Sequence, residues 1–188
     1  MPKDELAQLQ VSKRELVFKG RIWDVVRETF GYGTESLTRE FVDHPGAVAV
    51  VALNGQNEIL MIRQYRHPVK SYLWELPAGL LDVSGESKLA AAERELLEET
   101  GYRASTIEPL IDFFTTPGGN SESISIFLAK DLQHVGHDFS LEGEEIDMDV
   151  EWVPLLVALE SVLKSQIKSP TAQVGIMAIA LKLGIGAA

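Results

Sequence analysis

Three glutamates stand close together in one short stretch of the sequence: Glu95, Glu98 and Glu99. In an α-helix, residues three or four positions apart share a face, so these carboxylates would lie side by side. A like-charge pair at this spacing on an exposed helix costs about 0.2–0.5 kcal/mol. A hard divalent cation such as Mg2+ or Mn2+, which prefers oxygen ligands, would remove that repulsion. The pattern therefore indicates a metal-binding face or, as is commoner for an acidic face taken alone, a solvated surface.

The glutamates belong to the clearest helical segment of the chain, residues 86–100. Most residues of this segment favour helices, and Gly101 follows at a position where helices commonly end. Leu89, Ala92 and Leu96 form a second stripe, which we expect to pack on a sheet. The helix would thus present carboxylates on one side and an apolar surface on another.

The remaining segments predict a mixed α/β protein. Runs of apolar and β-branched residues are separated by turn-forming segments, and two apolar helices close the chain. We expect strands at 47–53, 59–65, 107–114, 124–129 and 148–153, and helices at 155–166 and 171–183. Strands and helices in this order favour an α/β sandwich with a mixed sheet.

Residues 11–43 predict a small antiparallel β unit ahead of this sandwich. The unit contains β-prone runs at 15–19, 22–30 and 37–42. Gly20 and a glycine-rich turn separate these runs. We therefore divide the chain into a β-rich N-terminal extension, residues 1–43, and a main domain, residues 44–188.

Composition excludes several classes of function. The 188 residues include no cysteine, which rules out disulfides and cysteine-based zinc sites. The net charge of −11 argues against nonspecific binding to nucleic acid or to an anionic membrane, although a bound cation would still permit a phosphorylated substrate. The N-terminus lacks the apolar core of a signal peptide, and the apolar stretch 174–183 is too short to span a bilayer. We expect a soluble, cytoplasmic protein with no nucleic-acid or membrane partner.

The segment from Gly79 to Tyr102 resembles the Nudix box. In that family pattern a glycine, five residues, a glutamate and seven residues precede Arg-Glu-apolar-x-Glu-Glu-x-Gly-apolar. The residues that match in register are Glu86, Arg94, Glu95, Leu96, Glu98, Glu99, Gly101 and Tyr102. Six residues, rather than five, separate Gly79 from Glu86. The extra residue lies in a loop, where insertions are tolerated, so it affects the shape of the loop more than the helix.

The resemblance implies a Nudix fold, an α/β/α sandwich extended by the N-terminal antiparallel unit, and a magnesium- or manganese-dependent hydrolase. It implies that Glu95 and Glu99 are metal ligands and that Glu98 serves both the metal site and catalysis. The carbonyl of Ala78 would offer a further ligand, and Gly79 would make a tight turn. Arg94 would be structural and held against Glu86, although helical spacing equally allows it to pair with Glu98. Magnesium would neutralise charge on a diphosphate and orient the attacking water.

Segments outside the box resemble those of ADP-ribose pyrophosphatases. They are His-Pro-Gly-Ala-Val at 44–48, Arg-Gln-Tyr-Arg-His-Pro at 63–68, Trp-Glu-Leu-Pro-Ala-Gly at 74–79, and Pro117, sixteen residues after Gly101. The resemblance implies hydrolysis of ADP-ribose to AMP and ribose 5-phosphate. A Pro-Gly-Gly sequence is also a common turn, so Pro117 and Gly118 alone would not identify a substrate site.

The same resemblance supplies candidates for substrate binding. Arg66 would bind phosphates bidentately, as suits a guanidinium, unless it pairs with surface acids. Arg39 is a weaker candidate for the same role. Phe18 or Trp23 could stack on adenine, and we expect at least one of the two to belong to the core. Glu75, Pro117 and Gly118 complete the predicted substrate-binding set.

An acidic loop at residues 141–147 contains the candidates for a general base. Taken alone, it would be a solvated charge run. ADP-ribose pyrophosphatases carry a catalytic glutamate on a loop at this place, which implies Glu144 or Glu145, with Glu144 preferred. The four histidines do not suggest a site, and we expect structural or solvent-exposed roles for them.

The resemblance also implies a homodimer that exchanges its N-terminal units and binds substrate across the interface. Alternative functions are hydrolysis of another substrate, such as a nucleotide sugar or a dinucleoside polyphosphate, and non-catalytic sensing of ADP-ribose. The sensor is disfavoured because Glu95, Glu98 and Glu99 are all present and no DNA-reading segment remains. A purely structural acidic domain would leave the spacing of the box unexplained.

Overall fold

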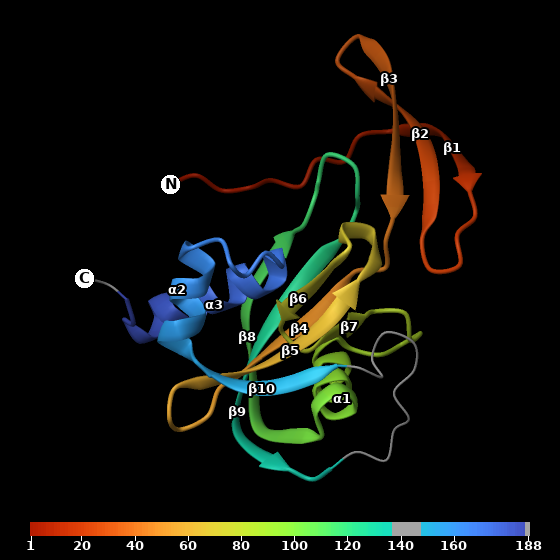
Figure 1. Cartoon of the computed structure of the whole chain (residues 1–188). Coiled ribbons are helices and arrows are strands. Elements are labelled where there is room, and N and C mark those ends of the chain that lie inside the picture. Colours follow the sequence, from red (N-terminus) through yellow and green to blue (C-terminus); the bar gives the residue numbers. More distant parts are fainter. Residues whose placement is uncertain (137–147, 187–188) are drawn as a thin grey trace. The chain divides into compact units, whose positions relative to one another are not determined.

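The computed structural model describes residues 1–136 and 148–186. It consists of two compact units (Figure 1). Unit 1 comprises Met1–Pro45 and Thr116–Glu122, and unit 2 comprises Gly46–Thr115 and Ser123–Ala188. The loop 116–122, which the sequence assigned to the main domain, thus packs within unit 1. The role of residues 1–43 as a functional extension stays a prediction.

Unit 1 is built on an antiparallel sheet of β1 (Val11–Phe18), β2 (Asp24–Tyr32) and β3 (Glu35–Asp43), in that order. The β2–β3 hairpin closes through two residues, the first of which is Gly33 at φ 61°. Glycine tolerates this left-handed conformation, which suits a tight hairpin turn. The predicted antiparallel unit is confirmed. Of all the residues in these strands, Val26 alone is buried.

Unit 2 contains two sheets. The larger has the order β7-β4-β9-β8, and β4 pairs with β9 in parallel whereas its other pairs are antiparallel. The predicted mixed sheet is therefore confirmed. The smaller sheet has the order β10-β5-β6 and is antiparallel. Their strands are β4 (Ala47–Ala52), β5 (Glu58–Arg66), β6 (Ser71–Glu75), β7 (Ala78–Leu80), β8 (Tyr102–Phe114), β9 (Ser123–His134) and β10 (Asp149–Pro154).

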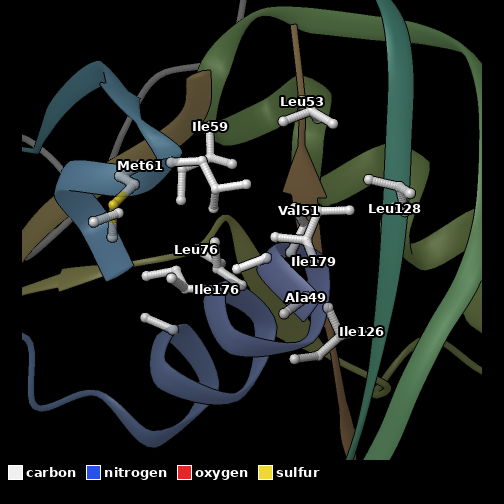
Figure 2. Packing of buried hydrophobic residues seen from close by; sticks show 14 of the residues in the cluster. Ala49, Val51, Leu53, Ile59, Met61, Leu76, Ile126, Leu128, Ile176 and Ile179 are labelled. Carbon is white, nitrogen blue, oxygen red and sulfur yellow. The ribbon is translucent and has the colours of Figure 1, made fainter. Parts of the chain in front are cut away.

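Helices cover both faces of the larger sheet (Figure 1). Strand β4 contributes side chains to the apolar cluster on each face. Its residues are all buried, and alternate side chains point to opposite faces. Ala49 and Val51 lie beside Ile176 and Ile179 of the last helix (Figure 2). Val48 packs in the second apolar cluster, with the helix that follows β7. The helices are α1 (Lys88–Thr100), α2 (Leu155–Leu163) and α3 (Pro170–Leu183). The predicted α/β/α sandwich is confirmed.

Several local predictions were wrong. The first helix begins at Lys88 rather than at residue 86, because Ser87 caps it and leaves Glu86 in the preceding loop. Leu89 is 41% exposed, and Ala91 rather than Leu89 joins the buried stripe. Strands β6 and β7 were not anticipated from the sequence, since each is short and a Pro-containing turn separates them.

The described part of the chain, 1–136 and 148–186, contains no helix with the length and apolar character that crossing a membrane requires.

Candidate active site

Helix α1, which carries the three glutamates, is fixed at both ends. Ser87 Oγ accepts a hydrogen bond from the Ala90 N–H at 3.1 Å. At the other end Gly101 adopts φ 71°, and its N–H donates to the Leu97 carbonyl at 2.8 Å. A serine N-cap and a left-handed C-terminal glycine both satisfy backbone groups that helix ends leave unpaired. Because the apolar face of α1 is also buried, its acidic face has a defined position.

Two glutamates of α1 reach the backbone of β7. Glu99 is 7% exposed and its Oε2 accepts from the Ala78 N–H at 2.9 Å. The Glu95 carboxylate lies directly over Gly79, where an added Cβ would come within 2.0 Å of Glu95 Cδ. Glycine is thus required by this close approach. The predicted tight turn at Gly79 was wrong, because the residue lies in a strand with no positive φ.

Arg94 binds three carboxylates at once. Its Nε and Nη2 donate to the two oxygens of Glu86 at 3.0 and 2.9 Å. Its Nη1 donates to Glu95 at 2.6 Å and to Glu98 at 3.1 Å. Both partners considered from the sequence, Glu86 and Glu98, are therefore present together. The hydrogen bond from Arg94 is the main cause that holds the pKa of Glu86 below its ordinary value.

The carboxyl group of Glu95 is affected by burial as well as by Arg94. Burial raises the pKa of its carboxyl group above the ordinary value. Arg94 opposes this effect, whereas the charges of Glu98 and Asp82 add to it. A cation bound beside Glu95 would favour its ionised form and so oppose the effect of burial.

The donor set fits a divalent cation. Carboxylate and carbonyl oxygens are the ligands that Mg2+ and Mn2+ prefer. Within residues 1–136 and 148–186, no three Asp, Glu or His side chains converge as a ready-made metal cage. Glu95 instead faces Arg94, and Glu99 faces Ala78. A partial protein set is what magnesium commonly uses, since it keeps several waters and takes further oxygens from substrate phosphates.

A second polar cluster joins the ends of β5 and β6. Arg66 donates from Nε and Nη2 to Glu75, with the shortest contact at 2.7 Å. Gln64 Nε2 also donates to Glu75, at 3.3 Å. Glu75 is 8% exposed, whereas the Arg66 side chain is 42% exposed. The buried carboxylate therefore orients a half-exposed guanidinium. Glu75, predicted to bind substrate, contacts Arg66 in this structure.

Unit 1 contains a cavity of about 420 Å3. It is lined by Arg39, Glu40 and Phe41 of β3 and by residues 117–121. The structure thus brings together three predicted substrate-binding residues, Arg39, Pro117 and Gly118. The Val42 N–H donates to the Gly119 carbonyl at 3.0 Å, which ties the loop to β3. Small-molecule pockets typically measure about 300–1,000 Å3, so the cavity has the size of a small-molecule site.

The two aromatic candidates also belong to unit 1. Phe18 ends β1 and is 62% exposed, and Trp23 precedes β2 and is 45% exposed. The expectation that one of them belongs to the core was wrong, because the three-stranded sheet buries almost none of its side chains. The two candidate bases, Glu144 and Glu145, lie outside the described residues.

Sequence reasoning missed two residues of these clusters. Asp82 acts on Glu95 through its charge. Gln64 is buried against Glu75. Asp82 lies in the same loop as the extra residue, and an acidic side chain inside the box-like segment was a usable signal. Gln64 gave no signal, since its burial depends on the pairing of β5 with β6.

Comparison with known proteins gives one family. The family model described as NUDIX domain matches residues 43–173. An ADP-ribose pyrophosphatase from Mycobacterium tuberculosis (strain ATCC 25618 / H37Rv) is 46% identical over 143 residues, 76% of this chain and 69% of that protein. An ADP-ribose pyrophosphatase from Bacillus subtilis (strain 168) is 38% identical over 153 residues, 80% of this chain and 79% of that protein.

A solved structure gives the same fold. The crystal structure of an ADP compounds hydrolase superimposes with a TM-score of 0.71 and covers 96% of this chain and 97% of that one. Only 22% of the residues are identical, so this likeness concerns the fold.

Proposed function

The chain belongs to the Nudix family, and from this membership we propose that it hydrolyses the diphosphate of ADP-ribose. One water adds its hydroxyl to one phosphorus as the P–O–P bond breaks, and its proton goes to the leaving phosphate. The products are AMP and ribose 5-phosphate. The observation that carries this proposal is the acidic face of α1 held against β7 by the Ala78 N–H and by the space above Gly79.

Nudix hydrolases generally need a divalent metal ion, and we propose Mg2+, with Mn2+ as a substitute. Glu95, Glu98, Glu99 and the Ala78 carbonyl would hold it. When bound, the ion supplies positive charge to the diphosphate oxygens and lowers the pKa of a coordinated water. Arg94 keeps Glu95 and Glu98 in place before the ion arrives. Glu98 is also proposed to take part in catalysis.

Arg66 is proposed to bind a phosphate of the substrate. A guanidinium offers paired donors that match phosphate geometry. Glu75 lies beneath it, accepts from two of its nitrogens and is itself held by Gln64. Glu75 would therefore serve substrate binding by orienting Arg66.

The cavity of unit 1 is proposed to take the adenosine part of the substrate. Arg39 supplies a cation at its wall, and Pro117 and Gly118 supply backbone and a small apolar surface. Trp23 and Phe18 are exposed aromatic side chains of the same unit. Exposed rings of this kind provide stacking surfaces for bases.

The general base is proposed to be Glu144, with Glu145 as the alternative. Each would be replaced by glutamine, which removes the basic carboxylate and keeps the shape. A general base contributes about 10²–10⁴-fold to a rate. If neither variant slows turnover by about tenfold, the base lies elsewhere or the attacking water needs none.

A homodimer is proposed from unit 1. Its strands expose Leu16, Val17 and Tyr32 as well as both aromatic candidates. A sheet with so little buried surface is marginal in water, and a second copy of the chain would cover it. Light scattering that gives only monomer would exclude the exchanged N-terminal units. Residence in the cytoplasm is also proposed, and the acidic, cysteine-free composition supports it.

The test is AMP release from ADP-ribose with Mg2+ or Mn2+, beside nucleotide sugars and dinucleoside polyphosphates. We expect ADP-ribose to have the highest kcat/KM, by about tenfold or more, since each 1.4 kcal/mol of selective binding gives a factor of ten. A higher kcat/KM for another compound would retain the hydrolase and replace the substrate. Binding of ADP-ribose without any hydrolysis would favour the sensor.

A further inference from the structure

His44 is buried, as its expected structural role requires, and its contacts reach residues beside the cavity of unit 1. Its side chain is 3% exposed, and its Nε2 lies 3.3 Å from Glu122 Oε1. Its ring also lies beside the indole of Trp23, with centroids 5.7 Å apart and planes inclined by 31°. One imidazole therefore contacts an aromatic residue before β2 and an acidic residue at the end of the loop 116–122.

The backbone of His44 is attached to the same loop. Its N–H donates to Ser121 Oγ at 2.9 Å, and Ser121 Oγ donates to the Val42 carbonyl at 3.2 Å. The Ser121 N–H donates to the same carbonyl at 3.0 Å. Residues 117–121 line the cavity of unit 1. The main chain of His44 is thus bonded to Ser121 of the cavity wall, and its side chain contacts Glu122, the next residue of the same loop.

The main chain around Trp23 forms a tight turn. Asp24 accepts from the Gly20 N–H at 3.2 Å and from Lys19 Nζ at 2.8 Å. A Cβ at Gly20 would lie 1.9 Å from the Trp23 carbonyl oxygen, so the chain can turn this closely only with glycine. The indole remains 45% exposed although His44 lies against it. A partly exposed indole that packs against another ring offers a surface for stacking.

We propose that His44 is a positioning residue for the recognition of a purine base. It holds the Trp23 ring in the orientation that stacks on the base and couples that ring to the loop 117–121 at the cavity. His44 does not contact the reacting phosphates in this scheme. The inference rests on the proposed function to the extent that the ligand of unit 1 is the nucleoside part of the substrate.

The experiment measures dissociation constants of AMP and UMP, which share a ribose and a phosphate and differ in the base. The variants are His44→Gln, which loses the ring, and His44→Phe, which keeps a ring and loses the link to Glu122. Stacking on an aromatic ring is worth enough to change affinity by about tenfold. For His44→Gln we expect AMP affinity to fall about fivefold to tenfold and UMP affinity to change less than about twofold, because a pyrimidine stacks less. His44→Phe should lie between wild type and His44→Gln.

Two further variants keep the test decisive. Leu163→Ala removes an exposed apolar side chain of α2, in unit 2, and should leave both dissociation constants unchanged. If His44→Gln does not fold, Ser121→Ala removes the Ser121 Oγ link to His44 and should reduce the preference for AMP in the same direction.

The outcomes separate the two proposals. Equal loss of AMP and UMP affinity in the His44 variants would mean a general structural role and would overturn the inference. The inference would also be overturned if the ratio of AMP affinity to UMP affinity stayed at its wild-type value in the His44 variants, or if the wild type bound neither nucleotide. ADP-ribose hydrolysis by the wild type is scored separately: its absence, with an AMP preference that depends on His44, would reject only the proposed reaction. In an active enzyme, the His44 variants should raise KM for ADP-ribose and leave kcat within about twofold, as expected when ground-state and transition-state binding weaken equally.

Discussion

The acidic face of α1 in unit 2 and the cavity of unit 1 are built in opposite ways. The acidic face comes from one short stretch of sequence and β7, and its glutamates Glu95 and Glu99 are 13% and 7% exposed. The cavity joins β3 to a loop nearly eighty residues later, and the two aromatic candidates of the same unit, Phe18 and Trp23, are 62% and 45% exposed. The groups proposed for chemistry are thus held before substrate binds, whereas the groups proposed for recognition depend on long-range contacts at a surface.

This difference makes separable predictions. Changes on the acidic face should lower kcat, because they alter groups that act in the transition state. Changes around the cavity should raise KM, because they alter binding that is the same in the ground and transition states. The comparison would fail if a variant of the acidic face changed only KM, or if a variant around the cavity changed only kcat.

The largest effect is expected for Glu99→Gln. The amide oxygen can still accept from the Ala78 N–H, so the fold should persist, but the negative charge of a proposed metal ligand is lost. We expect kcat to fall about 100-fold or more at saturating Mg2+, as charge stabilisation at a metal site is among the larger catalytic effects. Steady-state kinetics at several Mg2+ concentrations measures it. Wild-type kcat at high Mg2+ would show that Glu99 is only a structural acceptor.

Gly79→Ala should have the next largest effect. Its Cβ would meet Glu95 Cδ at 2.0 Å, so the carboxylate or β7 must move. A misplacement of about 1 Å at a catalytic group can cost about 100-fold, and overpacking costs about 1–3 kcal/mol of stability. Kinetics and thermal unfolding should therefore both change. Gly55→Ala, where an added Cβ meets nothing within 4 Å, is the matched control. Equal behaviour of the two variants would contradict the close approach.

The acidic face and the N-terminal sheet show which features could be predicted from the sequence and which could not. The spacing of Glu95, Glu98 and Glu99 predicted a shared face, because helical geometry is local. The sandwich followed from the order of strands and helices. The contact of Glu95 with Gly79 could not be predicted, since it depends on how β7 packs beside α1. The N-terminal sheet was predicted, but the exposure of Phe18 and Trp23 was not, because hydrophobic character alone suggests a core.

Arg66→Lys tests a side chain that is half-exposed, like the groups of unit 1, but is held by a buried carboxylate, like the groups of α1. Lysine keeps the charge and loses the paired donors that contact both oxygens of Glu75. We expect KM for ADP-ribose to rise about tenfold with kcat within about threefold, the equivalent of roughly 1.4 kcal/mol of binding. Steady-state kinetics distinguishes the two parameters. A fall confined to kcat would place Arg66 with the catalytic groups of α1.

Gly118→Ala tests the cavity itself. An added Cβ there meets nothing within 4 Å, and the residue has no positive φ, so the fold should tolerate it. A methyl group at the wall of a cavity that binds substrate should nevertheless raise KM, by about threefold to tenfold, because one methyl in a pocket is worth about 1 kcal/mol or more. Gly31→Ala is the matched control: it lies in unit 1, is equally open to an added Cβ and is absent from the cavity wall. Identical KM values for the two variants would argue that the cavity binds no part of the substrate.

The smallest kinetic effect is expected for Ser87→Ala, although the residue lies at the start of the helix that carries the acidic face. The variant removes the acceptor for the Ala90 N–H and leaves every glutamate in place. Loss of an N-cap costs about 0.5–2 kcal/mol of stability. Ser87→Asp, which restores an acceptor, is the control. Thermal unfolding should show the loss in Ser87→Ala alone, and kcat well below the melting temperature should match wild type. Since α1 is also fixed by Gly101 and by its buried face, a fall in kcat would mean that the N-cap contributes to the position of the carboxylates as well as to the stability of the helix.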